Sequence, residues 1–353
     1  MSSIPSIRGR IDALDRRLVK LLSARARLAQ RIGRLKEGAA YRPEREAQVL
    51  RGILAENRGP LPDAALARLF TEIMSACRAL EDSMTAAYLG PQGTFSQEAA
   101  VKHFGGLTAL APCSSIDEVF RRVETGAVGY GVVPVENSTE GAIGRTLDLL
   151  LSSPAQVCGE IMLPIRQCLM AKRDRLAGIR KIYSHAQSLS QCQQWLARNL
   201  PRAERIAVVS NAEAARLAAR ERSAAAIGPR TAAALYGLKL LARNIEDEAK
   251  NTTRFLVIAE HGAAPSGRDK TSLVMSTRNV PGAMHELLTP LAVNQVSMTR
   301  FESRPSRTGL WEYVFYVDVE GHQKDPRVER ALAELKQKAS LLKILGSYPV
   351  AVA

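Results

Sequence analysis

The first 37 residues carry an apolar repeat that restricts the fold more than any other feature of the chain. After Pro5 this segment is nearly free of helix-breaking residues. Its apolar positions advance in alternating steps of four and three residues, which is the spacing of a heptad seam. They are Ile7, Ile11, Leu14, Leu18, Leu21, Leu28, Ile32 and Leu35. The pattern predicts one long helix with an apolar heptad seam along one face.

Arg25 occupies the one seam position where the repeat calls for an apolar residue. On a straight helix Lys36 lies roughly 20° around from Arg25 and about three turns along, so both cations share a face and can bind one dianion. A buried cation needs a partner, which is either an anionic ligand or a carboxylate such as Glu46 or Glu81. A plain coiled-coil dimerisation arm and a buried Arg–Glu pair therefore remain alternatives to an anion site.

The middle of the chain has the pattern of an α/β module. Two further helices are predicted first, over residues 43–57 and 62–82. From Ala86 short β-rich runs alternate with helical stretches at 115–124, 189–199 and 211–221. This alternation predicts an α/β fold, and polar residues at the strand ends predict a two-lobed domain with a ligand crevice. A binding protein and an enzyme both fit this pattern.

A loop rich in Gly, Ala, Pro and Ser, residues 262–269, precedes a tail with a different order of elements. The tail is predicted to contain strand 271–277, helix 282–290, strand 294–303, strand 311–319, helix 325–341 and strand 342–347. That βαββαβ order predicts a ferredoxin-like α+β fold.

The net charge of +14 is distributed along the chain. Residues 1–85, 86–262 and 263–353 have excess charges of +6, +5 and +3, and aromatic residues make up only 5% of the chain. A nucleic-acid-binding protein would concentrate basic and aromatic residues, so this distribution favours anionic small substrates over nucleic acid.

Cysteine usage and hydropathy indicate a cytoplasmic protein. The five cysteines are never spaced as CxxC and do not cluster with histidines, so we expect reduced structural thiols and no metal site. No apolar run approaches the roughly 18 residues that a membrane-spanning helix needs. The charged start of the chain is unlike a signal peptide, and no membrane association is expected.

Four segments of the first 84 residues give a specific resemblance. These are RxxIDxLD at Arg8, the Arg25/Lys36 pair, YRPEREAQVL at Tyr41, and LFTEIMSACRALE at Leu69. Together they resemble the all-helical chorismate mutases of bacterial phenylalanine biosynthesis. The resemblance implies a pericyclic rearrangement of chorismate to prephenate, which needs no nucleophile, metal or cofactor, only a pocket that holds the reactive conformer.

By position, the resemblance implies that Arg8 and Arg25 hold the two carboxylates of chorismate and that Lys36 hydrogen-bonds the ether oxygen. On one helix Arg8 lies about 100° around from Arg25 and about 25 Å along the axis, too far to reach the same small dianion. A second, antiparallel copy can supply Arg8, which fits the interlocked dimer of the family. A solvated Arg8 without a role in the site is the alternative.

The other mutase residues that the resemblance implies lie in the second and third helices. Glu46 takes the ring hydroxyl of chorismate, with Arg45 beside it. Glu81 stands where some members have glutamine, and a carboxyl group donates to the ether oxygen only when it is protonated. Catalytic roles in this module thus go to Lys36 and Glu81.

The α/β module carries five segments that resemble prephenate dehydratases, in the order of that family. They are GPQGTFSQEA at Gly90, VPVENSTEG at Val133, SHAQSLSQC at Ser184, AAIGP at Ala225 and NTTRF at Asn251. The resemblance implies a periplasmic-binding-protein-like domain with two lobes. It also implies conversion of prephenate to phenylpyruvate by loss of CO₂ and hydroxide, which requires a proton or strong hydrogen bond on the leaving group.

In this family the favoured donor is the threonine of the TRF segment, here Thr253, and Glu136 is a second acid candidate or a support. The other substrate contacts that the resemblance implies are Thr94, Ser96, Asn137, Ser184, Gln191 and Arg254. Two of these residues have structural alternatives. Ser96 precedes QEA and can simply cap a helix, and Arg254 can stack structurally instead of neutralising a carboxylate.

The tail resembles the ACT regulatory domains of prephenate dehydratases through NVPGAMHELL at Asn279 and FESRPSR at Phe301. The resemblance implies an allosteric phenylalanine site in which backbone N–H groups at a helix start meet the amino-acid carboxylate. Its residues are Gly282, Ala283, Met284, Glu302, Ser303, Arg304 and Pro305. The alternative is that Pro281 and Gly282 merely start a helix.

Taken together, the sequence predicts a multidomain protein with an all-α mutase domain at 1–84, an α/β dehydratase domain at 85–262 and an α+β ACT domain at 270–353. We expect a cofactor-free bifunctional enzyme that binds chorismate, prephenate and phenylalanine and forms a homodimer or a larger homo-oligomer. A non-catalytic amino-acid sensor is the alternative, and the presence of Thr253, Asn137 and the Arg25/Lys36 pair argues against it.

Overall fold

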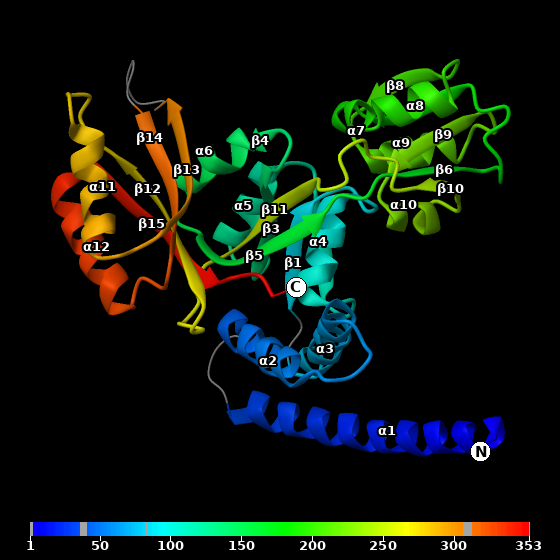
Figure 1. The fold of residues 1–353 in the computed structure, drawn as a ribbon, viewed down its shortest axis with the longest axis horizontal. Coiled ribbons are helices and arrows are strands. Elements are labelled where there is room, and N and C mark those ends of the chain that lie inside the picture. The colour runs from blue at the N-terminus through cyan, green and yellow to red at the C-terminus, as the bar shows by residue number, and fades with distance from the viewer. Residues whose placement is uncertain (1–2, 36–40, 82–83, 306–312, 353) are drawn as a thin grey trace.

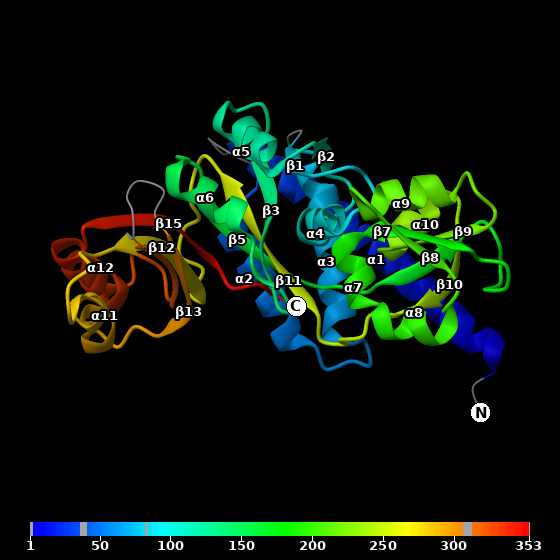
Figure 2. The same cartoon turned by 90° about the horizontal axis from the view of Figure 1, so that it is seen from above.

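The computed structural model describes residues 3–35, 41–81, 84–305 and 313–352. These residues form a helical module (residues 4–81), an α/β module of two lobes (residues 84–259) and a C-terminal module (residues 269–352), arranged as in Figures 1 and 2. This arrangement confirms the predicted fold class.

Three helices make up the helical module: α1 (Ile4–Leu35), α2 (Pro43–Glu56) and α3 (Asp63–Arg78). The long α1 runs beneath the other two in Figure 1 and contacts α3. None of its described residues is buried, and seam residues such as Leu14 and Leu28 are 54% and 57% exposed. No described part of the chain therefore covers the apolar seam, which leaves it available to another helix.

The first lobe of the α/β module is built on a mixed sheet in the order β2-β1-β3-β11-β5, with the short β4 paired to β3. Strand β1 pairs in parallel with β2 and β3, whereas β11 lies antiparallel between β3 and β5. Its elements are β1 (Thr85–Leu89), α4 (Phe95–Phe104), β2 (Ala109–Cys113), α5 (Ile116–Glu124), β3 (Tyr130–Asn137), β4 (Gly141–Ala142), α6 (Gly144–Ser152), β5 (Gln156–Pro164) and β11 (Thr252–Ala259).

The second lobe has its own sheet in the order β10-β6-β9-β7-β8. Residues 165–167 and 244–251 connect the two lobes, so the chain crosses between them twice. The predicted helix 189–199 is divided at Cys192 into two short helices. The elements are β6 (Cys168–Ala171), β7 (Lys181–His185), α7 (Ala186–Gln191), α8 (Gln193–Asn199), β8 (Glu204–Val208), α9 (Asn211–Ala218), β9 (Ala224–Gly228), α10 (Arg230–Leu235) and β10 (Lys239–Arg243).

The C-terminal module has the predicted βαββαβ order, and its four strands form an antiparallel sheet in the order β13-β14-β12-β15. Both helices pack on one face around Leu273, Leu287 and Leu335. The elements are β12 (Asp269–Ser276), α11 (Ala283–Val293), β13 (Met298–Pro305), β14 (Tyr313–Glu320), α12 (Pro326–Lys338) and β15 (Leu341–Pro349).

The C-terminal module and the first lobe share one hydrophobic core. Val274, Tyr316 and Tyr348 of the C-terminal sheet belong to the same buried cluster as Leu147 and Val157 of the lobe. Strand β15 approaches β5 so closely that a Cβ at Gly346 would lie 2.1 Å from the backbone oxygen of Val157. The two modules are thus one packed body rather than separate domains on a flexible link.

A buried aromatic cluster joins the helical module to the first lobe. Tyr41 packs edge-on against His103, Phe104 and Tyr130, and its hydroxyl is hydrogen-bonded to His103 Nε2. Burial is the main reason why the pKa of His103 is lowered to about 3, and the positive charge of Arg78 lowers this pKa further. His103 is therefore neutral in the folded protein at neutral pH.

The lowered pKa of His103 predicts that the folded protein loses stability on acidification. Below about pH 6.5 the unfolded chain protonates His103 while the folded chain does not, so the free energy of unfolding falls as the pH is lowered. The melting temperature of His103→Gln should therefore drop less between about pH 7 and about pH 5 than that of the wild type. The exposed His261→Gln serves as control and should follow the wild type; identical slopes in all three proteins would contradict the prediction.

No helix among the described residues is both long and apolar enough to cross a bilayer. All five cysteines are buried and free of disulfides, as expected for structural thiols.

Candidate active sites

In the helical module the structure brings Arg25, Glu46 and Glu81 near one another. Arg25 donates from Nη1 to Cys77 Sγ at 2.9 Å and has no ion pair among the described residues. Glu81 follows α3 and packs against Gly33 of α1, where a Cβ would lie 3.0 Å from Glu81 Cγ. The absence of a side chain at Gly33 thus lets α1 approach Glu81 closely.

Glu46 is held by Arg78 rather than by Arg25. Arg78 forms an ion pair with Glu46 and also donates to the backbone oxygen of Phe104 in α4. Burial raises the pKa of Glu46, and the charges of Arg78 and Arg25 oppose that shift. The predicted alternative of a buried pair between Arg25 and a glutamate is not seen in the described residues, because Arg78 is the partner of Glu46.

Of the other residues predicted for this site, the structure describes Arg8 and Arg45. Arg8 is exposed on α1, and its separation of 17 positions from Arg25 corresponds to about 25 Å along a helix. Arg45 is exposed on α2 beside Glu46. Lys36 lies outside the described residues. Arg78 was not predicted; it is the last residue of α3, where basic side chains are common, so its position gave no signal of a role in the site.

The α/β module brings Asn137 and Thr253 together at the ends of two paired strands. Thr253 near the start of β11 is the direct cross-strand neighbour of Asn137 at the end of β3. The Asn137 amide donates to Thr253 Oγ1 at 2.8 Å and to Asn251 Oδ1 at 2.9 Å, and Asn137 Oδ1 accepts from Thr139. Both Asn137 and Thr253 are buried, at 4% and 8% exposure.

This geometry determines what Thr253 can do chemically. A threonine hydroxyl has one proton to donate, and here its oxygen accepts from Asn137 while the described residues offer its proton no acceptor. The hydroxyl proton is thus left for donation to a further group. Asn251 also keeps one buried atom, Nδ2, without a partner in the described structure. Asn251 was not predicted as a site residue, although it begins the NTTRF segment that drew attention to Thr253.

Across the lobe boundary a second polar cluster contains Gln191. Gln191 Nε2 donates to Glu140 Oε1 of the first lobe at 3.2 Å, and Gln167 Nε2 donates to Gln191 Oε1 and to Ser188 Oγ. Gln167 Oε1 is buried without a partner among the described residues. Gln167 was missed because it lies in an inter-lobe connection, where sequence pattern gives no spatial information.

The other hydroxyl residues predicted here have structural partners. Ser184 is fully buried and donates to the backbone oxygen of Ile227 at 2.9 Å. Thr94, not Ser96, is the N-cap of α4 and accepts from Gln97 N at 3.4 Å. The proposed cap role of Ser96 is therefore wrong; Ser96 is a buried residue of the first helical turn.

The structure does not bring Glu136 or Arg254 to the Thr253 cluster. Successive side chains of a strand point to opposite faces, so these two neighbours of Asn137 and Thr253 project toward the C-terminal module. Glu136 lies 3.0 Å from Arg300 of β13, and Arg254 forms ion pairs with Glu160 and Asp318.

The residues predicted for amino-acid binding lie at two places in the C-terminal module. Gly282 has φ of +81° and stands at the N-terminus of α11, a backbone conformation that favours glycine, while Ala283 is buried and Met284 partly buried. The Glu302–Pro305 segment lies in β13, where Arg304 donates to Asp148 of α6 at 3.3 Å. No polar contact among the described residues joins the two places.

A cavity of about 760 Å³ lies between the helical module, α4 and the C-terminal residues Pro349–Val352. Glu46 and His103 line it, but Arg25, Asn137 and Thr253 do not. We therefore locate the candidate sites by their side-chain clusters and not by this cavity. The described residues contain no cluster of His, Cys, Asp or Glu suited to a metal ion.

Three family models match consecutive parts of the chain. "Chorismate mutase type II" matches residues 7–82, "Prephenate dehydratase" matches 86–263 and "ACT domain" matches 271–337.

Curated relatives and a solved structure are similar to the chain over most of its length. A bifunctional chorismate mutase/prephenate dehydratase of Neisseria gonorrhoeae is 54% identical over 98% of this chain and 96% of its own length. The bifunctional chorismate mutase/prephenate dehydratase of Stutzerimonas stutzeri is 51% identical over 99% of this chain and 98% of its own length. The structure of a prephenate dehydratase from Arthrobacter aurescens in complex with L-Phe has a TM-score of 0.70 at 34% identity, covering 76% of this chain and 93% of that one.

Proposed function

The chain belongs to the family of bifunctional chorismate mutases/prephenate dehydratases, and from that premise we propose how its residues carry out the two reactions. The enzyme rearranges chorismate to prephenate in the helical module and converts prephenate to phenylpyruvate in the α/β module. The observation that supports the second assignment is the Asn137–Thr253 pair, in which the buried Thr253 oxygen accepts from Asn137 and its proton has no acceptor among the described residues.

For the mutase step, we assign Arg25 to a carboxylate of chorismate because it is half-buried without a carboxylate partner among the described residues. Glu46, oriented by Arg78, accepts the ring hydroxyl, with Arg45 at its side. Lys36 and a protonated Glu81 donate to the ether oxygen as its bond to the ring breaks. These contacts stabilise a polarised transition state, so the reaction needs no covalent intermediate.

For the dehydratase step, Thr253 donates its proton to the departing hydroxyl while CO₂ leaves and the ring becomes aromatic. Asn137 holds the Thr253 oxygen, and Asn251 holds Asn137. Gln191, Ser184 and the start of α4 at Thr94 and Ser96 surround the substrate across the two lobes. The unpartnered Gln167 Oε1 and Asn251 Nδ2 are suited to further substrate hydrogen bonds.

The C-terminal module supplies feedback by phenylalanine in this proposal. The relative from Arthrobacter aurescens was solved with L-Phe, and the predicted Glu302–Pro305 segment contacts the α/β module through Arg304 and Asp148. The left-handed turn at Gly282 offers backbone N–H groups at the start of α11 to an amino-acid carboxylate.

We further propose a cytoplasmic homodimer with domains at 1–84, 85–262 and 270–353. The exposed heptad seam of α1 supports the dimer, because a second, antiparallel α1 would cover it and bring its Arg8 toward Arg25.

One assay tests the proposed function directly. Purified enzyme incubated with chorismate should form prephenate and then phenylpyruvate, and added phenylalanine should inhibit the second step. A non-catalytic amino-acid sensor would bind phenylalanine without consuming chorismate. Consumption of chorismate without phenylpyruvate formation would leave only the mutase assignment standing.

The role of Glu81 leads to a prediction about its substitutions. A side-chain amide donates a hydrogen bond to an ether oxygen as a carboxylic acid does, whereas alanine offers no donor. Glu81→Gln should therefore retain mutase kcat/KM, and Glu81→Ala should lower it by about 10²-fold or more. The exposed Glu56→Ala is the matched control and should keep the wild-type value; equal activity in Glu81→Ala and the wild type would make Glu81 a structural residue.

A further inference from the structure

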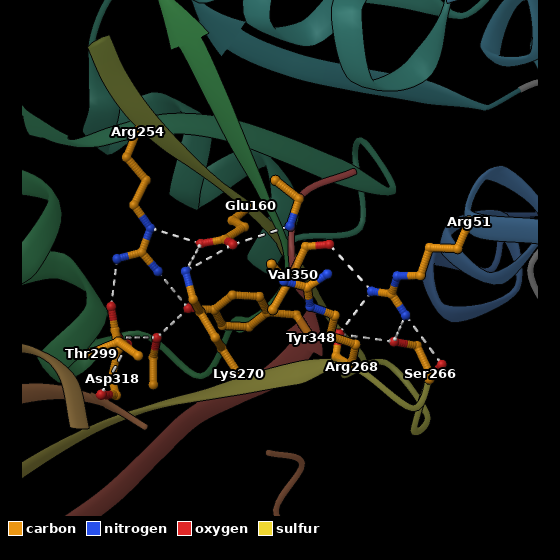
Figure 3. A network of polar contacts seen from close by, with 12 residues as sticks. Arg51, Glu160, Arg254, Ser266, Arg268, Lys270, Thr299, Asp318, Tyr348 and Val350 are labelled. Atoms are coloured by element: carbon orange, nitrogen blue, oxygen red, sulfur yellow. Dashed lines mark hydrogen bonds and ion pairs between the residues drawn. The ribbon is translucent and has the colours of Figure 1, made fainter. Parts of the chain in front are cut away.

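Arg254, the residue after Thr253, connects three strands of two modules. Its Nε donates to Glu160 Oε2 at 3.0 Å, Nη1 to Asp318 and Nη2 to the Tyr348 hydroxyl at 2.8 Å (Figure 3). Glu160 lies on β5 of the α/β module, whereas Asp318 and Tyr348 lie on β14 and β15 of the C-terminal module. The arginine beside the proposed proton donor thus spans the boundary between the modules.

The surroundings of Arg254 form a balanced, buried network. The side chains of Arg254, Glu160 and Asp318 are only 9%, 1% and 5% exposed. Lys270 adds a second cation on Glu160 at 3.0 Å, and Ser272 donates to Asp318. Two cations therefore face two carboxylates, which is the arrangement in which buried charges are tolerated and hold a defined geometry.

Arg254 lies on β11 at the point where the pairing of this strand with β3 becomes irregular. The pairing of β11 with β3 shifts register between Arg254 and Phe255, immediately after the Thr253–Asn137 pair. At such a bulge the ladder of backbone hydrogen bonds is interrupted, so it does not by itself fix the direction of the neighbouring side chains. On its other edge β11 pairs with β5 in regular register from Thr252 to Val257, and the side-chain bonds of Arg254 add a further restraint beside the bulge.

We propose that Arg254 is a positioning residue of the dehydratase, which orients Thr253 through β11 and makes turnover depend on where Asp318 of the C-terminal sheet holds its guanidinium. This inference rests on the proposed dehydratase function and replaces the expectation that Arg254 contacts prephenate. A shift of β14 relative to β5 would move the Arg254 side chain and, through β11, the neighbouring Thr253. The regulatory module thereby has a short physical connection to the donor hydroxyl.

The test compares three variants by steady-state kinetics with prephenate. Arg254→Lys keeps the charge but cannot bind Glu160, Asp318 and Tyr348 together. Asp318→Asn changes only the C-terminal side of the contact. The pair Arg254→Met with Asp318→Leu replaces both charges by apolar groups, which preserves folding better than one uncompensated loss. Arg122→Lys serves as the control. The Arg122 side chain on α5 hydrogen-bonds only Glu118 among the described residues.

The proposal predicts that all three variants lose dehydratase kcat by about 5- to 150-fold and respond less to phenylalanine, with KM for prephenate unchanged. Melting temperatures and mutase activity without phenylalanine show that each variant is folded.

A raised KM at unchanged kcat in Arg254→Lys would instead mean that Arg254 binds prephenate. Normal kcat in Asp318→Asn, or recovery of kcat together with melting temperature in the apolar pair, would also overturn the proposal. A wild type that forms no phenylpyruvate would refute the proposed function itself.

Discussion

Thr253→Ala is expected to lower phenylpyruvate formation from prephenate by about 10²- to 10⁴-fold, the usual contribution of a positioned proton donor. The alanine removes the hydroxyl that Asn137 orients and leaves the Asn137 amide one partner short. Because Arg25, Glu46 and Glu81 lie in the helical module, conversion of chorismate to prephenate should continue at the wild-type rate. Prephenate should therefore accumulate when the variant is given chorismate.

Two neighbouring substitutions make this result specific to the Thr253 hydroxyl. Thr253→Ser retains the donor and should recover most of the activity. Thr252→Ala removes the adjacent hydroxyl, whose only described bond is one to the backbone oxygen of Lys250 at 3.3 Å, and should leave both activities near the wild type. Loss of both activities in a Thr253→Ala protein with a normal melting temperature would contradict the assignment, as would equal effects at positions 252 and 253.

Arg8→Ala and Arg25→Ala are each expected to abolish nearly all mutase activity as homodimers, yet to regain activity when the two proteins are refolded together. In the proposed antiparallel pairing each site takes Arg25 from one chain and Arg8 from the other. A mixed dimer then contains one intact site and one site that lacks both arginines. Random pairing makes about half of the dimers mixed, so roughly a quarter of the wild-type activity should return if the sites act independently.

The dehydratase provides the internal standard for this experiment. Phenylpyruvate formation from prephenate should be the same in both variants and in the mixture, since neither arginine lies in the α/β module. As a matched control, the exposed Arg17→Ala on the same helix should retain mutase activity as a homodimer. If confirmed exchange of subunits restores no activity, Arg8 serves its own chain or no site at all.

The sequence by itself determined the modules and their order, because these depend on local patterns. The heptad repeat specified the long α1, and the change from helical to β-rich periodicity separated the module that follows it. The βαββαβ order of the tail could be predicted because hydrophobic residues recur with different periods in strands and in helices. The segments VPVENSTEG and NTTRF also pointed to Asn137 and Thr253 as site residues, and the structure then showed that they are cross-strand neighbours.

Only the tertiary structure decided what each side chain faces. Strand alternation makes Thr253 and Arg254 point in opposite directions, but the sequence could not tell that the face of Arg254 is covered by Asp318 and Tyr348. It offered Arg25 as a partner for Glu46, whereas the fold supplies Arg78. These partners lie 32 to 94 residues apart in the chain, and contacts over such separations arise from the tertiary packing of helices and strands, which leaves no periodic trace in the sequence.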